Sequence, residues 1–430
     1  MFDTGKKAVG GRCSSRVLSL QGEKVIFDHS AQYIQIDKSK VNPVFKNLLE
    51  SLEAKGVVKE WVGEMGTIDA ETNQITTATS SDSTRYVAVN GMGELSKHLA
   101  DGLEVSQNVW VNKLEKVGGN KWRLYANGKQ LGDFDAVIIA HNGKCADKLV
   151  SSVSHIVPEI HDRLKVNFGP SIKGIQNMRK MQLCSLWALV FAVKACSIDD
   201  SKLKSNNIEA CIVNKSSKLS WICNTSKKLG VNGSIESWTV ISTKEFAAAN
   251  KVPQENVPKE VDEKIKHELL REFESLLGLE VNRVQPIVSK AQLWGAAIPI
   301  NRYNAPFIYD GKHQIGVCGD WFKTGHESLG PSIESSYMSA YYLAQHLSSS
   351  SGKDAFIENN MFGYEICEEK SLSGNSDSGS STAGKMMSGP LLSTGPLNLA
   401  LGGNTAAVAT AATMKIKKKK TRKPPAINSK

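Results

Sequence analysis

The sequence predicts an α/β protein that combines a parallel sheet with a second, largely antiparallel one. Residues 135–140 and 315–318 are short apolar runs without alternation, which is typical of strands buried on both faces. Residues 183–193 and 220–243 indicate strands of the second sheet. Apolar residues recur every three or four positions over 258–279, so an amphipathic helix is expected there, ending near Gly278.

The other elements follow from local patterns in chain order. Residues 24–36 indicate strand, turn and strand, and 93–103 a helix that begins after Gly91. Residues 109–142 predict a β-meander, with turns at Gly118-Gly119-Asn120, Asn127-Gly128 and Gly132-Asp133. After strand 315–318 we expect a loop and then a helix from about Ser332, with Pro331 in its first turn.

Length and composition indicate two or three folded domains and a different C-terminal region. The chain has 430 residues, 40% of them hydrophobic, and a net charge of +10. Eight of these charges lie in 415–430, so the folded part is nearly neutral and is not expected to bind nucleic acid. Residues 353–430 are predicted to be a low-complexity basic tail, disordered over 370–430. The uncharged stretch at 390–414 is too polar for a good membrane span.

Cysteine usage predicts an intracellular protein. The eight cysteines form no C-x-x-C pair and have no spacing typical of zinc ligands, so no metal site is expected. From the polar start we expect no signal peptide. We expect a cytoplasmic location, with plastid or nucleus as alternatives.

The most informative motifs lie near the two ends of the folded part. Asp3 ends a short strand, and acidic residues in that position bind ribose in dinucleotide folds. Gly10 and Gly11 let the backbone approach a ligand, and Arg12 can pair with a pyrophosphate. Far along the chain, Gly319 and Asp320 follow a strand and precede a helix, an arrangement that presents a carboxylate and a helix N-terminus to one ligand.

Together these motifs resemble renalase-like flavoproteins of the amine-oxidase-type FAD family. The resemblance covers roughly residues 1–347 and rests on "FDTGKKAVGGRCSSR", "FDHSAQYIQ", "YVAVNGMGELSKHLADGL", "DFDAVIIAHN" and "IGVCGDWF". It implies that Asp3 binds ribose, that Gly10, Gly11 and Arg12 lie against the pyrophosphate, and that Val111 meets the adenine. Gln32 and Tyr33 would line the flavin region, and Gly319, Asp320 and Trp321 would lie beside the ribityl chain. Trp294, with Tyr33, is a candidate wall of the substrate pocket.

The resemblance also implies a domain arrangement. A discontinuous Rossmann-type FAD-binding domain (1–40, 86–150 and 310–348) would be interleaved with a substrate domain (41–85 and 151–309). The family begins with a strand and a G-x-G-x-x-G loop, and neither precedes Asp3 in this sequence. We therefore expect the N-terminus to be incomplete, with the first βα unit missing.

The function implied is an FAD-dependent oxidoreductase. It would oxidise a small amine or a reduced nicotinamide-like substrate, including NAD(P)H, by hydride transfer to flavin N5, with dioxygen as the electron acceptor. No residue is identified as the catalytic acid or base. Two alternatives remain open: a truncated or degenerate relative that binds no FAD, and a desaturase-like or NAD(P)-linked flavoenzyme.

Overall fold

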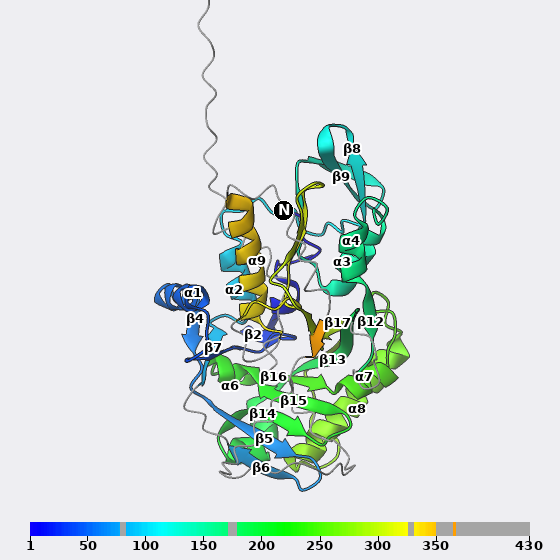
Figure 1. The fold of residues 1–430 in the computed structure, drawn as a ribbon. Helices are drawn as coiled ribbons and strands as arrows, with labels where there is room; N and C mark the ends of the chain where they lie inside the picture. Colours follow the sequence, from blue (N-terminus) through cyan, green and yellow to red (C-terminus); the bar gives the residue numbers. More distant parts are fainter. Residues whose placement is uncertain (78–82, 171–178, 326–330, 350–363, 367–430) are drawn as a thin grey trace, which may run out of the picture.

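A computed structural model describes residues 1–77, 83–170, 179–325, 331–349 and 364–366. Its largest element is an eight-stranded sheet that fills the lower half of Figure 1. Strand β13, Met181–Lys194, lies inside this sheet and pairs antiparallel with β16, Ile235–Ser242, and with β17, Val288–Pro299. The remaining strands are β12 (Val166–Phe168), β15 (Leu219–Asn224), β14 (Ile208–Asn214), β5 (Glu64–Asp69) and β6 (Gln74–Thr77). The predicted, largely antiparallel second sheet is confirmed.

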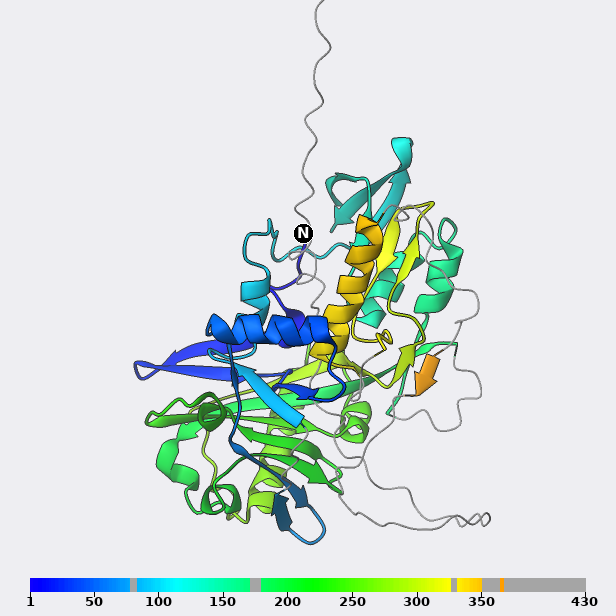
Figure 2. The same cartoon turned by 60° about the vertical axis from the view of Figure 1, so that its left-hand side comes forward.

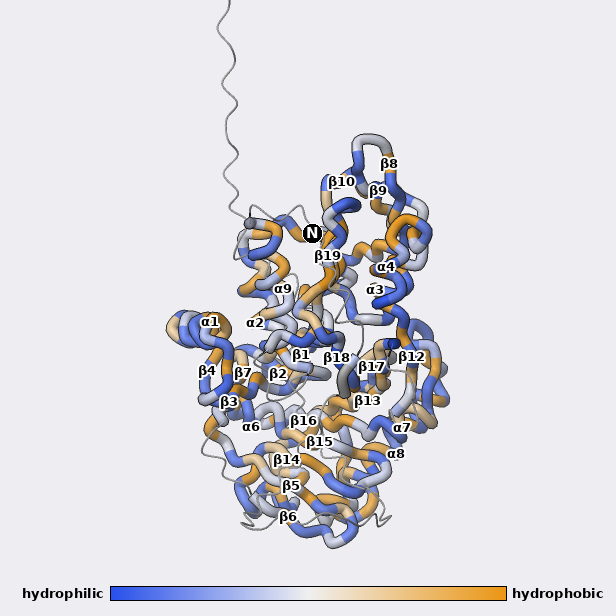
Figure 3. Tube along the Cα trace, viewed as in Figure 1, coloured by the Kyte–Doolittle hydropathy of each residue, from blue (hydrophilic) through white to orange (hydrophobic). Residues whose placement is uncertain are grey.

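Helix α8, Lys259–Leu277, covers one face of this sheet and confirms the predicted amphipathic helix. Its buried stripe, which includes Leu269 and Phe273, packs against the alternate β13 residues Leu189 and Phe191. The helix ends where Gly278 adopts φ +71°, a conformation that favours glycine. Figure 3 shows how strongly apolar residues concentrate in the strands of this sheet. Short helices in the connections that follow its strands are α5 (Lys202–Ser205), α6 (Thr225–Leu229) and α7 (Lys244–Ala249), with a 3₁₀ turn at Ala195–Ile198.

The opposite face of the sheet is covered by the N-terminal part of the chain. Strands β1, Ser15–Leu20, and β2, Glu23–Asp28, form a hairpin over β13 and β16. A small sheet follows, built from β3 (Ile34–Asp37), β7 (Ser83–Ala88) and β4 (Val58–Glu60). Helices α1 (Pro43–Ala54), α2 (Gly93–Leu99) and α9 (Ile333–Ser348) pack beside it, and Figure 2 shows α1 crossing near the start of α9.

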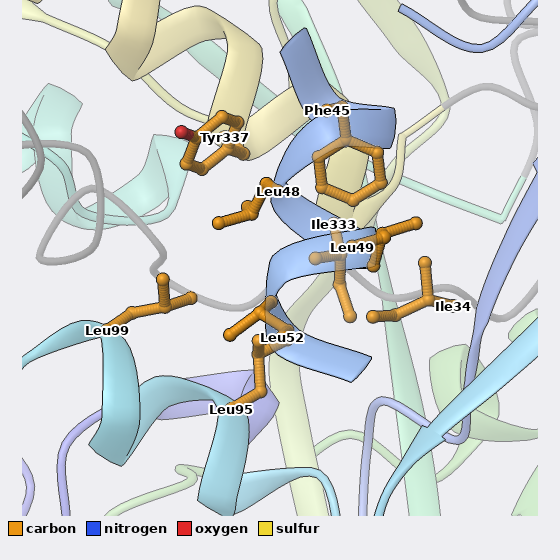
Figure 4. A pocket seen from close by; sticks show the side chains of 9 residues that line it. All are labelled: Ile34, Phe45, Leu48, Leu49, Leu52, Leu95, Leu99, Ile333 and Tyr337. Atoms are coloured by element: carbon orange, nitrogen blue, oxygen red, sulfur yellow. The ribbon is translucent and has the colours of Figure 1, made fainter. Parts of the chain in front are cut away.

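These three helices enclose a small, entirely apolar pocket (Figure 4). Nine side chains line it, and all but Tyr337 are hydrocarbon: Ile34, Phe45, Leu48, Leu49, Leu52, Leu95, Leu99, Ile333 and Tyr337. The cavity has a volume of only about 10 Å³, room for about one water molecule. It is part of the same hydrophobic core that extends under β15 and β16.

The third region holds the two buried runs that the sequence marks as parallel strands. Strand β11, Val137–Ile139, pairs parallel with β20, Ile315–Val317, which in turn pairs with β19, Ile308–Asp310. At the N-terminus, Phe2 forms a parallel bridge to Ser106. Helices α3 (Gly143–Ser151) and α4 (Pro158–Leu164) pack against these strands. The parallel pairing of β11 and β20 confirms a mixed α/β fold.

The predicted meander is confirmed as β8 (Lys113–Val117), β9 (Lys121–Ala126) and β10 (Lys129–Phe134), with a 3₁₀ turn at Gly118–Asn120. The turn at Asn127 and Gly128 is present, with φ of +50° and +81°. The turn predicted at Gly132-Asp133 is wrong, because both residues lie inside β10, next to a register shift between Gln130 and Gly132. Glycine inside a strand often marks such a bulge.

One further strand lies inside the segment predicted to be the tail. Strand β21, Tyr364–Ile366, pairs with β18, Asn301–Tyr303, and Tyr364 is buried. The rest of the predicted tail, including the stretch at 390–414, lies outside the described residues. Over the described part of the chain, no helix combines the length and apolar character that a membrane crossing requires. The domain boundaries proposed from the sequence stay a prediction.

Candidate functional site

Arg12 and Asp320, 308 positions apart in the sequence, meet in a buried ion pair. Arg12 lies in the 3₁₀ helix Gly11–Cys13, and Asp320 follows strand β20. The guanidinium donates to both carboxylate oxygens at 2.9 Å and, through Nη1, to the carbonyl of Ala297 at 2.6 Å. Arg12 is 5% exposed and the Asp320 side chain 3%. The structure thus brings together the two motifs that the sequence identifies separately.

The Arg12 guanidinium still has donors to offer. It carries five N–H groups, and three hydrogen bonds connect it to described residues. The remaining donors sit on a cation that is almost completely buried. Such a group suits a phosphate, whose oxygens match the geometry of the guanidinium.

Asp320 stands at the carboxyl edge of parallel strands, where open α/β sheets bind ligands. Strands β11 and β20 are in register, and Cys318 N donates to the carbonyl of Ile139 at 3.1 Å. The segments that follow β11 and β20 therefore leave the sheet side by side, one leading to His141 and the other to Asp320. Helix α3 begins directly after β11, with the side chain of Asn142 accepting from Cys145 N.

Four buried polar atoms near these segments have no hydrogen-bond partner among the described residues. They are His29 Nδ1, Ser30 Oγ, His141 Nδ1 and Trp321 Nε1. Leaving a buried donor or acceptor unsatisfied costs about 1–3 kcal/mol, so a ligand that pairs with such an atom gains affinity from it. Trp238 Nε1, in the core beneath α8, is unsatisfied as well, so these atoms support a ligand here only together with the Arg12–Asp320 geometry. All four belong to sequence segments that carry the flavoprotein resemblance or follow them directly. A ligand rich in hydroxyls, ring nitrogens and phosphates fits this set of residues.

The glycines and Asp3 have partners within the protein. Gly10 has φ +109°, and a Cβ there would lie 2.4 Å from Ser96 Oγ, so this glycine lets α2 approach closely. Gly11 has φ +52° at the start of the 3₁₀ helix. The Asp3 carboxylate accepts from Gly5 N at 2.7 Å, and burial raises its pKa. Val111 is buried in the core beneath the meander. Contacts of these residues with a nucleotide stay predictions.

Gln32 and Tyr33 are completely enclosed. Gln32 Nε2 donates to the carbonyls of Asp28 and Ser30 at 2.7 and 2.9 Å, and its Oε1 accepts from Trp221 Nε1 at 3.2 Å. Tyr33 lies in the core, 5.5 and 5.7 Å from the rings of Trp61 and Trp221, and burial raises its pKa to about 12. Gln32 therefore shapes the 28–32 loop from within, and its predicted place beside a flavin stays a prediction.

Lys228 is a functional candidate that sequence reasoning misses. Its Nζ lies 2.7 Å from Asp28 Oδ2 and 2.7 Å from the Gln32 carbonyl, and both charged side chains are fully buried. The other oxygen of Asp28 accepts from Ser15 Oγ and Met92 N. Lys228 thus holds both ends of the 28–32 loop. Nothing in its local sequence, a short polar helix with Lys227 beside it, distinguishes it from a surface lysine.

The remaining predicted residues border the same region. Trp294 Nε1 donates to the carbonyl of His29 at 2.9 Å, which places this indole beside the 28–32 loop. Gly319 N donates to Ser339 Oγ, and a Cβ on Gly319 would lie 2.8 Å from Trp321 Nε1. Trp321 is fully buried and stacks on Phe322 with ring centroids 3.9 Å apart.

The five buried cysteines among the described residues are poor candidates for thiolate chemistry. Burial raises the pKa to about 12 for five cysteines: Cys13, Cys184, Cys211, Cys223 and Cys318. At neutral pH these thiols stay protonated and are poor nucleophiles. Within the described ranges, no group of three His, Cys, Asp or Glu side chains has the arrangement of a metal site.

No protein-family model matches the chain. Among solved structures, a putrescine oxidase bound to putrescine is similar at 10% identity, over 67% of this chain and 78% of its own, with a TM-score of 0.41. An oxidoreductase from Methanosarcina mazei is similar at 11% identity, over 78% and 91%, with a TM-score of 0.44. The tetracycline destructase Tet(51) is similar at 14% identity, over 78% and 75%, with a TM-score of 0.37.

Proposed function

We propose that the chain is an FAD-dependent oxidoreductase of the amine-oxidase type, related to the renalase-like proteins. Its substrate would be a small amine or a reduced nicotinamide-like compound such as NAD(P)H, and its electron acceptor dioxygen. The observation that carries this proposal is the buried Arg12–Asp320 pair at the carboxyl edge of β11 and β20. The unsatisfied polar atoms around it support a polar, extended ligand.

Each part of this pair has a distinct role in the proposal. Arg12 would bind the pyrophosphate through its remaining N–H groups, with Gly10 and Gly11 keeping the backbone close. Asp320 would accept hydrogen bonds from ribityl hydroxyls, beside Gly319 and Trp321. Asp3 and Val111 would lie at the adenosine end.

Helix α9 begins next to Asp320 and would contribute its dipole. Ser332 caps the helix by accepting from Ser335 N at 3.1 Å, and Ser335 Oγ donates to the Asp320 carbonyl at 3.4 Å. The partial positive charge of a helix N-terminus stabilises negative charge nearby, by about 0.3–1 kcal/mol at exposed sites. When bound, the flavin would supply the hydride-accepting N5 and return the electrons to dioxygen. Trp294 and Tyr33 are the proposed pocket walls.

Calorimetric titration of the purified full chain with FAD tests this proposal. We expect saturable binding at one site, weakened at least tenfold by Arg12→Lys, because lysine keeps the charge but loses the planar fork. The matched control is Arg123→Lys, in a partly exposed bidentate pair with Asp133 at 2.7 and 2.9 Å on the meander. Thermal melting of each variant verifies folding.

Three results discriminate between the functions left open by the sequence. Absence of FAD binding refutes the proposal and favours a relative that binds no flavin. Anaerobic bleaching of bound flavin by dihydronicotinamide isomers or small amines supports the renalase-like and amine-oxidase activities. Bound flavin that none of these compounds bleaches favours a desaturase-like enzyme instead.

A further inference from the structure

Five polar and aromatic side chains line the seam between strand β17 and the β1–β2 hairpin, and we call them the β17 seam: Arg16, His29, Lys290, Gln292 and Trp294. Side chains alternate along a strand, so positions 290, 292 and 294 share one face of β17 with Val288. The hairpin covers that face, since Val288 packs against a cluster with Leu18, Val25 and Phe27. Arg16 is the cross-strand partner of Phe27 and therefore faces the sheet as well.

The members of the seam contact one another directly. Arg16 Nη2 lies 2.8 Å from Gln292 Oε1. Trp294 Nε1 donates to the His29 carbonyl at 2.9 Å, and the two rings lie 5.5 Å apart with planes 31° from parallel. Lys290 is exposed, Arg16, Gln292 and Trp294 are half-buried, and His29 is 6% exposed. The seam thus runs from solvent at Lys290 to a buried imidazole at His29.

The seam carries positive charge without a counter-charge. Within the described part of the chain, neither Arg16 nor Lys290 forms an ion pair, and Arg16 has only a neutral amide as partner. The nearby carboxylates are engaged elsewhere: Asp28 by Lys228 at 2.7 Å and Asp262 by Lys266 at 2.5 Å. Repulsion from Arg16 is the largest cause that lowers the pKa of Lys290.

A ligand would also satisfy a buried polar atom in the seam. His29 Nδ1 has no hydrogen-bond partner among the described residues. Burial and then repulsion from Arg16 lower the pKa of His29 to about 4, so the imidazole is neutral at pH 7. A neutral imidazole has one donor and one acceptor nitrogen, and in the tautomer protonated at Nδ1 this atom would donate to the ligand.

We propose that the β17 seam binds the anionic group, a carboxylate or a phosphate, of the small molecule on which the protein acts, which favours an anion-bearing substrate such as NAD(P)H over a simple amine. Arg16 and Lys290 would pair with the anion, while Trp294 and His29 contact the rest of the molecule. This inference rests on the proposed function, because it places the substrate next to the flavin site. Ala297, three positions further along β17, accepts the hydrogen bond from Arg12, so the seam borders that site.

Calorimetric titration of the full chain with benzoate and, separately, with inorganic phosphate tests the inference. We expect Arg16→Gln to weaken binding at least tenfold and Lys290→Gln to weaken it several-fold. Lys129→Gln, which removes an exposed charge on the distant β10, should leave it unchanged. Trp294→Phe should weaken the binding of benzoate but not of phosphate, which distinguishes stacking from pure anion pairing.

The controls separate this inference from the flavin proposal. Saturable binding of an anion without FAD binding supports the β17 seam as an anion site and refutes the flavin proposal. FAD binding without saturable binding of either anion refutes the proposal that the β17 seam binds an anion. Equal affinities in the wild type and Arg16→Gln also overturn it. If thermal melting shows that Arg16→Gln is unfolded, Lys290→Gln decides, because its exposed side chain supports no core contact.

Discussion

Replacement of Lys228 by methionine is a sharp test of how the 28–32 loop is held. Lys228 and Asp28 are fully buried, their charged atoms are 2.7 Å apart, and Lys228 also donates to the Gln32 carbonyl. Methionine has a similar length and fills the same space without a charge. The substitution therefore removes an ion pair and a hydrogen bond while largely preserving the packing.

The expected loss of stability follows from what remains in the folded state. Asp28 Oδ1 keeps its bonds from Ser15 and Met92, but Oδ2 loses the partner that neutralises the carboxylate. Breaking a buried pair by removing one partner costs about 3–5 kcal/mol. The control is Lys165→Met, because Lys165 lies 2.6 Å from Asp162 with both side chains about half exposed. That change should cost less than about 1 kcal/mol.

Urea unfolding at pH 7, followed by tryptophan fluorescence and far-UV circular dichroism, measures both changes. The double variant Asp28→Asn with Lys228→Met should be less destabilised than the sum of the two single variants, because no buried charge remains without its partner. A loss below about 1 kcal/mol for Lys228→Met would contradict the reasoning. So would equal losses for Lys228→Met and Lys165→Met.

Three further substitutions test other parts of the fold. Gly10→Ala should lower the free energy of unfolding by about 1–3 kcal/mol, because φ is +109° and the new Cβ meets Ser96. Gly22→Ala, at φ +85° with open space around it, is the control and should lower it by only about 1 kcal/mol. Equal losses would argue against the close packing of α2. His29 has a folded pKa of about 4, below the ordinary 6.5, so the unfolded chain binds more protons and stability falls as pH drops through this interval. His29→Gln should reduce the stability lost between pH 7 and pH 4 by up to roughly 3 kcal/mol. If urea unfolding gives the same dependence of stability on pH for the variant and the wild type, His29 is not the cause of the loss. Leu49→Ala, in the pocket of Figure 4, should lower the free energy of unfolding in urea by about 2–5 kcal/mol. The control Val17→Ala, at a position 51% exposed, should lower it by less than about 0.5 kcal/mol. Similar values for the two variants would contradict the packing described.

Much of the architecture follows from local sequence patterns. The apolar runs that become β11 and β20, the stripe of α8 and the turn at Asn127 and Gly128 each carry their own signal. The turn predicted at Gly132-Asp133 fails because the same residue types also occur in bulged strands. Local signals thus predict elements well where only one structure fits the pattern.

The candidate site could be predicted only in part. Arg12 and Asp320 stand in recognisable motifs, so each could be identified, although their direct pairing could not. The partnership of Asp28 with Lys228 joins positions 200 residues apart, and long-range ion pairs leave no local pattern. The enclosure of Tyr33 by Trp61 and Trp221 depends on how three separate segments of the chain pack. The renalase-like assignment and the domain boundaries stay predictions.

A crystal structure of the full chain grown with FAD tests the central claim most directly. We expect the pyrophosphate within hydrogen-bond distance of Arg12 and a ribityl hydroxyl on Asp320, with the start of α9 facing the flavin ring. Crystals that form with saturating FAD but retain the closed Arg12–Asp320 pair, with no dinucleotide at the carboxyl edge of β11 and β20, would contradict it.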